Sequence, residues 1–172
     1  MIAPGEPVWR TSDLGVPLRI TVNGRETRRT VSPRTSLADF LRDGLGLTGL
    51  HLGCEHGACG ACAVLLDGRS VRACIVLAAQ VDGCSVETIE GISQGGNNAL
   101  QQAISRHHGL QCGFCTPGFV VMATELLREL EQTGMAVDEV GVRERLAGNF
   151  CRCTGYQGIV EAVLDAASHR EG

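Results

Sequence analysis

Gln111-Cys112-Gly113-Phe114-Cys115-Thr116-Pro117 places two cysteines, separated by two residues, directly before a predicted helix. Thr116 suits the N-cap of this helix, and Pro117 suits its first position because the missing N–H would have no partner there. Backbone N–H groups and the positive end of the helix dipole favour thiolates over thiols at such a place. The pair is therefore a candidate metal-binding or redox site.

A second pair of thiols, Cys151 and Cys153, follows in Asn149-Phe150-Cys151-Arg152-Cys153-Thr154-Gly155-Tyr156. Two loops with two thiols each can close around one four-coordinate thiolate centre. On spacing alone, a C-x2-C pair with a distant C-x-C pair fits zinc about as well as it fits iron–sulfur. A thioredoxin-like role for the first pair is less favoured, because the surrounding pattern is helical and not βαβ.

A third motif, Gly53-Cys54-Glu55-His56-Gly57-Ala58-Cys59-Gly60-Ala61-Cys62, has the spacing C-x4-C-x2-C, and Cys74 follows as a distant fourth thiol. This is the plant-type [2Fe–2S] spacing. Gly57 and Gly60 permit positive φ and a close approach of the backbone to an inorganic core. A zinc site usually shows two short pairs instead, so iron–sulfur is favoured here and gains weight for the other set.

Nine cysteines are present in all, and Cys84 is the one left over from two sets of four. In a reducing compartment this number indicates metal ligation before disulfides, and an odd count also fits disulfides poorly. We interpret Cys84 as a buried structural thiol.

The composition narrows the class of protein. Of the 172 residues, 44% are hydrophobic and 20% are charged, and the net charge is −4, which argues against nucleic-acid binding. Residues 1–17 have neither a basic segment nor an apolar run of the signal-peptide type, and no stretch is apolar enough to span a membrane. We expect a cytoplasmic protein without a membrane span.

The first half of the chain predicts a small mixed sheet with one helix packed on it. Alternating residues from Leu18 to Val22, the turn Asn23-Gly24 and a returning strand over 25–31 form one hairpin. Ser36 caps a short helix that ends near Gly44. The segments 63–66 and 70–76, joined by the turn Asp67-Gly68, form a second hairpin that carries Cys74, and a last strand covers 85–89.

The second half predicts four helices around short loops, which is a small bundle. Asn97 or Asn98 caps the first, Pro117 begins the second, Asp138 caps the third, and the fourth covers 156–168. The segment 92–96 is expected to be the linker between the two halves.

The three cysteine motifs together resemble the iron–sulfur subunit of the xanthine oxidase family of molybdenum hydroxylases. The resemblance covers about residues 17–168 and includes all eight cysteines of the two sets. It implies an α+β fold, with a plant-type β-grasp ferredoxin domain at residues 17–92 and a four-helix domain at residues 93–172. Each domain would hold one [2Fe–2S] cluster, and residues 1–16 would form an N-terminal extension.

The resemblance also implies a role for each set. The cluster nearer FAD would be held by Cys54, Cys59, Cys62 and Cys74, and the cluster nearer the molybdenum cofactor by Cys112, Cys115, Cys151 and Cys153. Gln111 and Cys153 would approach the pterin. Electrons would pass from molybdenum through the pterin to the helical-domain cluster, then to the β-grasp cluster, then to FAD.

The chain is too short to hold the molybdenum or flavin domains and shows no G-x-G-x-x-G motif, so it would be a relay without catalytic residues. The implied partners are a large molybdopterin-binding subunit and a medium FAD-binding subunit, with a dimer of heterotrimers as a family-level expectation. Substrate contacts would lie on the large subunit.

Two other functions stay open on the residues alone. A free-standing ferredoxin-like carrier needs only the first cluster, so the helical half argues against it. A zinc-stabilised interaction module is the other, and metal analysis would separate it. Among other polar residues, Arg152 either stabilises cluster charge or contacts a partner, whereas His107 and His108 suit a helix C-terminus better than a metal site.

Overall fold

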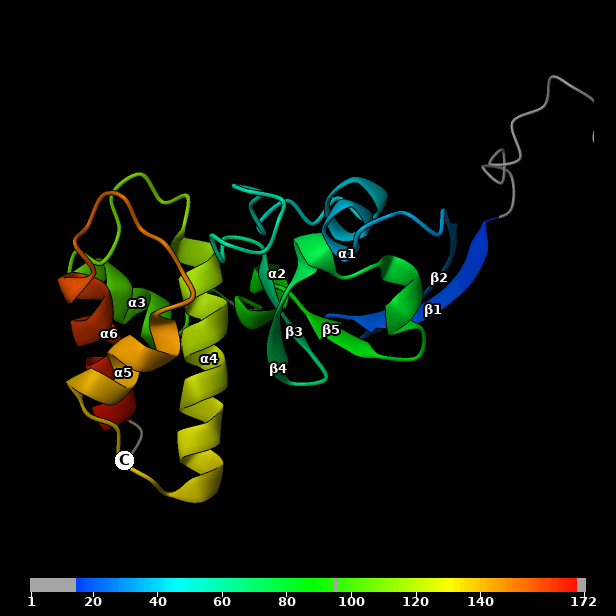
Figure 1. The fold of residues 1–172 in the computed structure, drawn as a ribbon. Coiled ribbons are helices and arrows are strands. Elements are labelled where there is room, and N and C mark those ends of the chain that lie inside the picture. Colours follow the sequence, from blue (N-terminus) through cyan, green and yellow to red (C-terminus); the bar gives the residue numbers. More distant parts are fainter. Residues whose placement is uncertain (1–14, 95, 170–172) are drawn as a thin grey trace, which may run out of the picture.

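A mixed sheet and a group of helices lie side by side in the computed structural model, which describes residues 15–94 and 96–169 (Figure 1). The predicted N-terminal extension, residues 1–16, lies outside the described residues except for its last two. The second of these, Val16, already belongs to the first strand. Within the described part, no helix has the length and apolar character needed to cross a bilayer.

The sheet formed by the described residues has five strands in the order β2-β1-β5-β3-β4. The strands are β1 (Val16–Val22), β2 (Arg25–Val31), β3 (Ala63–Leu66), β4 (Arg69–Arg72) and β5 (Ser85–Glu87). β5 runs parallel to β1 and antiparallel to β3, and the two hairpins are antiparallel. The last strand of the chain thus lies between the two hairpins and joins them into one sheet, as the predicted β-grasp fold requires.

Two tight turns build the hairpins. Asn23 and Gly24 have φ values of 50° and 77°, and Asp67 and Gly68 have φ values of 47° and 83°. Left-handed conformations at both central residues define the type I′ turn, whose twist matches that of the flanking strands. Both predicted turns are therefore confirmed.

One helix covers the inner face of the sheet. α1 (Leu37–Asp39) continues into a π-helical turn (Phe40–Gly44), and the Ser36 hydroxyl accepts the Asp39 N–H at 3.0 Å, which confirms the predicted cap. The helix packs on the alternate β1 side chains that point away from solvent. The buried core at this place includes Leu18, Ile20, Val22, Leu37, Leu41, Val64 and Val86.

The second hairpin is shorter than predicted. β4 ends at Arg72, and Cys74 lies in a 3₁₀ turn (Ala73–Ile75) and not on the strand. The Ala73 N–H bonds to the Cys62 carbonyl at 3.2 Å, so the chain leaves the strand as it meets the cysteine loop.

The last strand also ends early. β5 stops at Glu87 because the Thr88 N–H bonds to the Asn23 side chain at 2.8 Å and not to a neighbouring strand. A short helix, α2 (Ile89–Ile92), follows where the sequence predicts the end of a strand and the start of a linker. The division of the chain at residues 92/93 stays a prediction.

Four helices form the described part of the second half, as predicted. They are α3 (Ala99–Arg106), α4 (Thr116–Thr133), α5 (Glu139–Leu146) and α6 (Gln157–Ser168). Asn98 caps α3 by accepting the Gln101 N–H, and Asp138 caps α5 by accepting the Gly141 N–H. The helices enclose a core of their own that includes Leu100, Ile104, Phe119, Val120, Leu146, Ile159 and Val163.

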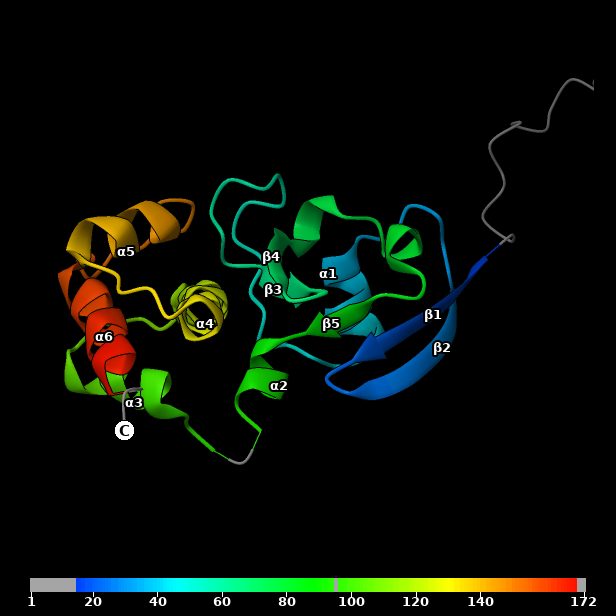
Figure 2. The same ribbon diagram turned by 90° about the horizontal axis from the view of Figure 1, so that it is seen from below.

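The helix α4 joins the two halves, because it lies between the sheet and the other helices (Figure 2). Val121 packs against Ala63 and Leu65 of β3, and all three are buried. Arg128 of α4 makes two hydrogen bonds to Glu87 of β5, at 2.6 and 3.0 Å. The helix thus packs against both cores and fixes their relative position.

Candidate metal centres

The loops that carry the cysteine motifs all lie at one end of the molecule (Figure 1). One loop precedes β3, the second connects α3 to α4, and the third connects α5 to α6. The two thiol sets are thus neighbours in space although the motifs are far apart in the sequence.

The first thiol set is arranged as two pairs. The Cys59 N–H donates to the Cys54 sulfur at 3.3 Å, and the Cys62 and Cys74 thiols are hydrogen-bond partners of each other. The backbone N–H of His56, followed by that of Cys59, lowers the pKa of Cys54 to about 6. Burial raises the pKa of Cys62 to about 11. The loop therefore already presents N–H donors to one sulfur and encloses another.

The second thiol set is also arranged as two pairs. The Cys153 and Cys112 sulfurs are 3.5 Å apart, and the Cys115 and Cys151 thiols are hydrogen-bond partners. Cys112 and Cys153 are exposed, whereas Cys151 is buried. One pair thus faces solvent, and the other faces the helical core.

The polypeptide's own groups do not favour a thiolate at Cys115, contrary to the prediction from the helix terminus. Burial is the largest influence on this thiol and raises its pKa to about 12. Burial also acts on Cys151, but the Thr154 hydroxyl and two backbone N–H groups outweigh it and lower the pKa of that thiol. A bound metal would have to compensate for the burial of Cys115.

The predicted N-cap Thr116 is also wrong. The helical conformation begins one residue earlier, because Cys115 has φ −83° and ψ −15° and its carbonyl accepts the Phe119 N–H. Gly113, with φ 80°, makes the turn that brings the chain into the helix. The Thr116 hydroxyl is buried without a hydrogen-bond partner among the described residues, so it does not cap α4.

The paired arrangement bears on the choice between zinc and iron–sulfur. A structural zinc ion needs four ligands that converge on one point. Two separate thiol pairs suit a cluster of two iron atoms with two thiolates on each iron. The donor set of each site therefore fits a [2Fe–2S] cluster better than a single zinc ion.

Glycine at position 60 lets the first cysteine loop lie directly against the second half. Gly60 has φ 79°, and a Cβ atom there would lie 1.9 Å from the Asn149 Oδ1 atom. Gly118, in the first turn of α4, is equally restricted, because its Cβ would lie 2.4 Å from the Gly60 carbonyl oxygen. The predicted positive φ at Gly60 is therefore confirmed, and the close neighbour that the structure shows there is the Asn149 side chain of the other half. The approach of this backbone to a cluster stays a prediction.

A set of contacts that we call the seam joins the first cysteine loop to the loops of the second set. The Phe150 N–H donates to the Cys59 carbonyl at 2.9 Å. His51 stacks on Phe114 with ring centroids 4.8 Å apart, and its Nδ1 atom lies 2.7 Å from the Phe114 carbonyl oxygen. The Arg72 guanidinium donates to the Gly148 carbonyl at 2.8 Å.

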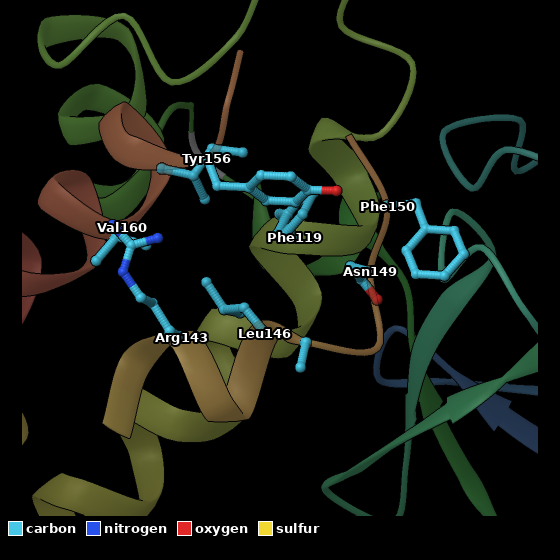
Figure 3. A pocket seen from close by; sticks show the side chains of 9 residues that line it. Phe119, Arg143, Leu146, Asn149, Phe150, Tyr156 and Val160 are labelled. Atoms are coloured by element: carbon cyan, nitrogen blue, oxygen red, sulfur yellow. The ribbon is translucent and has the colours of Figure 1, made fainter. Parts of the chain in front are cut away.

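Tyr156 is a site residue that sequence reasoning did not single out. Its hydroxyl accepts the Cys151 N–H at 3.0 Å, and its ring meets Phe119 edge to face at 6.2 Å. Figure 3 shows the ring extending from the start of α6 across Phe119, beside a cavity of about 220 Å³. A left-handed φ of 71°, unusual for a residue other than glycine, puts the ring there. Nothing in the local sequence signals this conformation.

The other singled-out residues lie outside the two thiol sets or at their surface. Gln111 and Arg152 are exposed beside the second set. Cys84 is half-buried against the core of the sheet half and not fully buried as predicted, and its thiol has a weak contact to the Asp82 carbonyl at 4.0 Å. His107 bonds to Asp165 at 3.0 Å, so it connects α3 to α6 and does not face the thiols.

Comparison with known proteins gives a consistent family. Residues 20–91 match the family described as "2Fe-2S iron-sulfur cluster binding domain", and residues 88–164 match "[2Fe-2S] binding domain". The nicotine 6-hydroxylase small subunit of Paenarthrobacter nicotinovorans is 54% identical over 88% of this chain and 89% of its own length.

Solved and fused relatives extend this result. The crystal structure of quinoline 2-oxidoreductase from Pseudomonas putida 86 contains a chain with a TM-score of 0.84 and 46% identity, matched over 92% of this chain and 98% of that one. The aldehyde oxidoreductase of Megalodesulfovibrio gigas is 48% identical over 87% of this chain, but the match is only 16% of its own length. The same two-part unit thus occurs both as a separate subunit and as part of a longer chain.

Proposed function

This chain belongs to the iron–sulfur subunits of the xanthine oxidase family of molybdenum hydroxylases, and we propose that its two thiol sets each hold one [2Fe–2S] cluster and relay electrons between partner subunits. The chain is the electron-transfer part of a multi-subunit oxidoreductase. It contributes no substrate site of its own, since the bond-making chemistry belongs to cofactors on other chains.

The ligands proposed for the sheet-half cluster are Cys54, Cys59, Cys62 and Cys74. Those proposed for the helical-half cluster are Cys112, Cys115, Cys151 and Cys153. The contacts between thiols support one iron on each pair, with Cys54 and Cys59 together and Cys112 and Cys153 together. The clusters would supply one-electron transfer, and the chain orders their ligands and supplies N–H donors to the sulfurs.

The single observation that carries the relay is the bond from the Phe150 N–H to the Cys59 carbonyl. Phe150 is covalently joined to Cys151, so one hydrogen bond connects the backbone of the first thiol set to that of the second. Cys151 is buried, whereas Phe150 is 59% exposed. A short, ordered connection between two redox sites is what an internal relay needs.

The direction of electron transfer is proposed from the exposure of the second thiol set together with family membership. Cys112 and Cys153 lie at the surface, and Gln111 is exposed beside them. We propose that Gln111 and Cys153 approach the pterin of a molybdenum cofactor on a large partner subunit. The cluster of the sheet half would then deliver electrons to FAD on a medium subunit.

The composition of the whole complex is also proposed from family membership. A heterotrimer of large, medium and small subunits, duplicated by a two-fold axis, suits a chain that carries only the relay. A cytoplasmic location suits nine free thiols, because a reducing compartment keeps them available for cluster assembly.

Low-temperature EPR of the complex, reduced with dithionite and integrated for spin, tests this proposal. We expect two distinguishable [2Fe–2S] signals of equal weight, with four iron atoms per chain by metal analysis. A single signal with zinc in the other site would reduce the chain to a one-cluster carrier and contradict the relay. Cys84→Ser is the matched control, because this thiol lies outside both sets and its replacement should leave both signals unchanged.

A further inference from the structure

Asn149 is a buried polar side chain whose presence the ligand sets do not explain. It is 2% exposed, and neither its amide nitrogen nor its amide oxygen has a hydrogen-bond partner among the described residues. Such groups are uncommon, because each loses the hydrogen bonds it makes to water in the unfolded chain. A leucine of similar size would fill the space without this cost. The amide therefore indicates a partner that becomes available only when the neighbouring cysteine loops are ordered around their ligands.

The amide lies between the backbones of the two cysteine regions. Its Oδ1 atom is only 1.9 Å from the place of a Cβ at Gly60, and its Nδ2 atom is 3.2 Å from the place of a Cβ at Gly118. Gly60 lies between two thiols of the first set, and Gly118 follows Cys115 in the first turn of α4. One side chain thus contacts the chain segments that carry ligands of both proposed clusters.

Asn149 also precedes the residue that makes the connecting bond. The Asn149 N–H is held by the Leu146 carbonyl at 3.0 Å, and the next N–H along, that of Phe150, reaches the Cys59 carbonyl. Figure 3 shows the Asn149 and Phe150 side chains side by side on the loop after α5, with the Phe150 ring turned toward the sheet. Displacing the amide would move this N–H relative to its acceptor.

We propose that Asn149 is a positioning residue for electron transfer between the two clusters. When the clusters are in place, its amide hydrogen-bonds to the ordered cysteine loops, either to backbone groups or to sulfur. This bond holds the Phe150 N–H on the Cys59 carbonyl. The inference rests on the proposed function, because it requires a cluster in each site.

The test uses Asn149→Leu and Asn149→Ala in the intact complex. The rate of electron transfer between the clusters is measured after rapid one-electron reduction, and the spin–spin splitting of the EPR signals is measured in the fully reduced protein. We expect both variants to load both clusters, to lose at least tenfold in the rate and to change the splitting. Leucine fills the space without an amide, so it should be as slow as alanine.

Three results would contradict the role of the amide. If leucine restores the rate that alanine loses, packing alone positions the seam, and if both variants keep the wild-type rate, the side chain has no part in transfer. Asn149→Ser retains a hydrogen-bonding group in a smaller side chain and should recover part of the rate lost in alanine. A serine variant no faster than alanine would also count against hydrogen bonding.

Thr88→Val is the control for a general loss of stability. Thr88 is fully buried, and its side chain is hydrogen-bonded to Asn23 and Glu90, which lie outside both cysteine motifs. The Thr88→Val substitution should lower the melting temperature without changing the rate of electron transfer between the clusters. A complex with only one EPR signal in the wild-type chain would contradict the proposed function itself. Two normal signals with unaltered rates in the Asn149 variants would contradict only this inference.

Discussion

The two thiol sites reach similar paired arrangements by different routes. In the first site, Cys54, Cys59 and Cys62 belong to the loop before the β3–β4 hairpin, and Cys74 lies in the 3₁₀ turn directly after that hairpin. In the second site, Cys112 and Cys115 precede α4, whereas Cys151 and Cys153 precede α6. The four thiols therefore come together only when the helices are packed. The first site is thus determined mainly by local chain geometry and the second by tertiary structure.

The largest expected effect separates the two sites completely. Cys115→Ser removes one thiol of the second site and leaves the first loop untouched, so we expect the loss of one of two EPR signals and the loss of turnover. Iron analysis and EPR of the complex measure this result. If the first signal also disappears, the two sites are not independent in assembly, and if turnover persists, the relay order is wrong.

Gly60→Ala should damage the place where the two sites meet. The new Cβ would lie 1.9 Å from Asn149 Oδ1, on a backbone with φ 79°. Left-handed strain and overpacking together should cost roughly 2–5 kcal/mol of folding free energy. The midpoint of thermal or denaturant unfolding measures the loss.

The control for that variant is Gly68→Ala. Gly68 has nearly the same φ, 83°, but nothing lies within 4 Å of its Cβ position. Strain alone should cost about 1–2 kcal/mol there. Equal losses in the two variants would mean that the close contact at Gly60 is relieved at no cost.

Tyr156→Phe tests the dependence of the second site on packing. The change keeps the ring against Phe119 but leaves the N–H of the buried Cys151 without its hydroxyl acceptor. The loss of stability should be about 1–3 kcal/mol. EPR should show an altered second signal and an unaltered first signal. A change in the first signal alone would contradict the assignment of this contact to the second site.

The smallest expected effect concerns the ion pair between the halves. Arg128→Met removes a two-bond contact to Glu87 that is partly exposed. Such pairs contribute about 0.2–1 kcal/mol, and salt weakens them. A double-mutant cycle with Glu87→Gln measures the coupling. The matched control is Arg143→Met, which removes an ion pair within one half, because Arg143 and its partner Glu139 lie on the same helix.

The sequence predicts best what neighbouring residues determine. The turns Asn23-Gly24 and Asp67-Gly68 and the caps Ser36, Asn98 and Asp138 each depend on contacts within a few residues, and all are present. The alternation along β1 and the helical spacing in the second half likewise indicate which faces are buried.

Predictions fail where a distant contact decides the conformation. Cys74 lies outside the strand because the Ala73 N–H bonds to the cysteine loop. Thr116 is not the N-cap because the turn at Gly113 starts the helix one residue earlier. The high pKa of Cys115 comes from burial by the folded helices, which outweighs the effect of the helix terminus. The sulfur pairs, the role of Tyr156 and the unpaired Asn149 likewise depend on segments that meet only in the folded chain.

The bond between Phe150 and Cys59 has a consequence for how the subunit matures. Cys59 belongs to the first thiol set, and Phe150 directly precedes Cys151 of the second set. Because the bond joins the two loops, ordering one loop also restricts the other. Insertion of the first cluster orders both loops in part, so the second loop has less conformational entropy left to lose when its own cluster is inserted. Insertion of the second cluster should therefore be easier once the first cluster is in place. The first site needs only its own loop and Cys74, so it should still load in a chain whose second site is disabled.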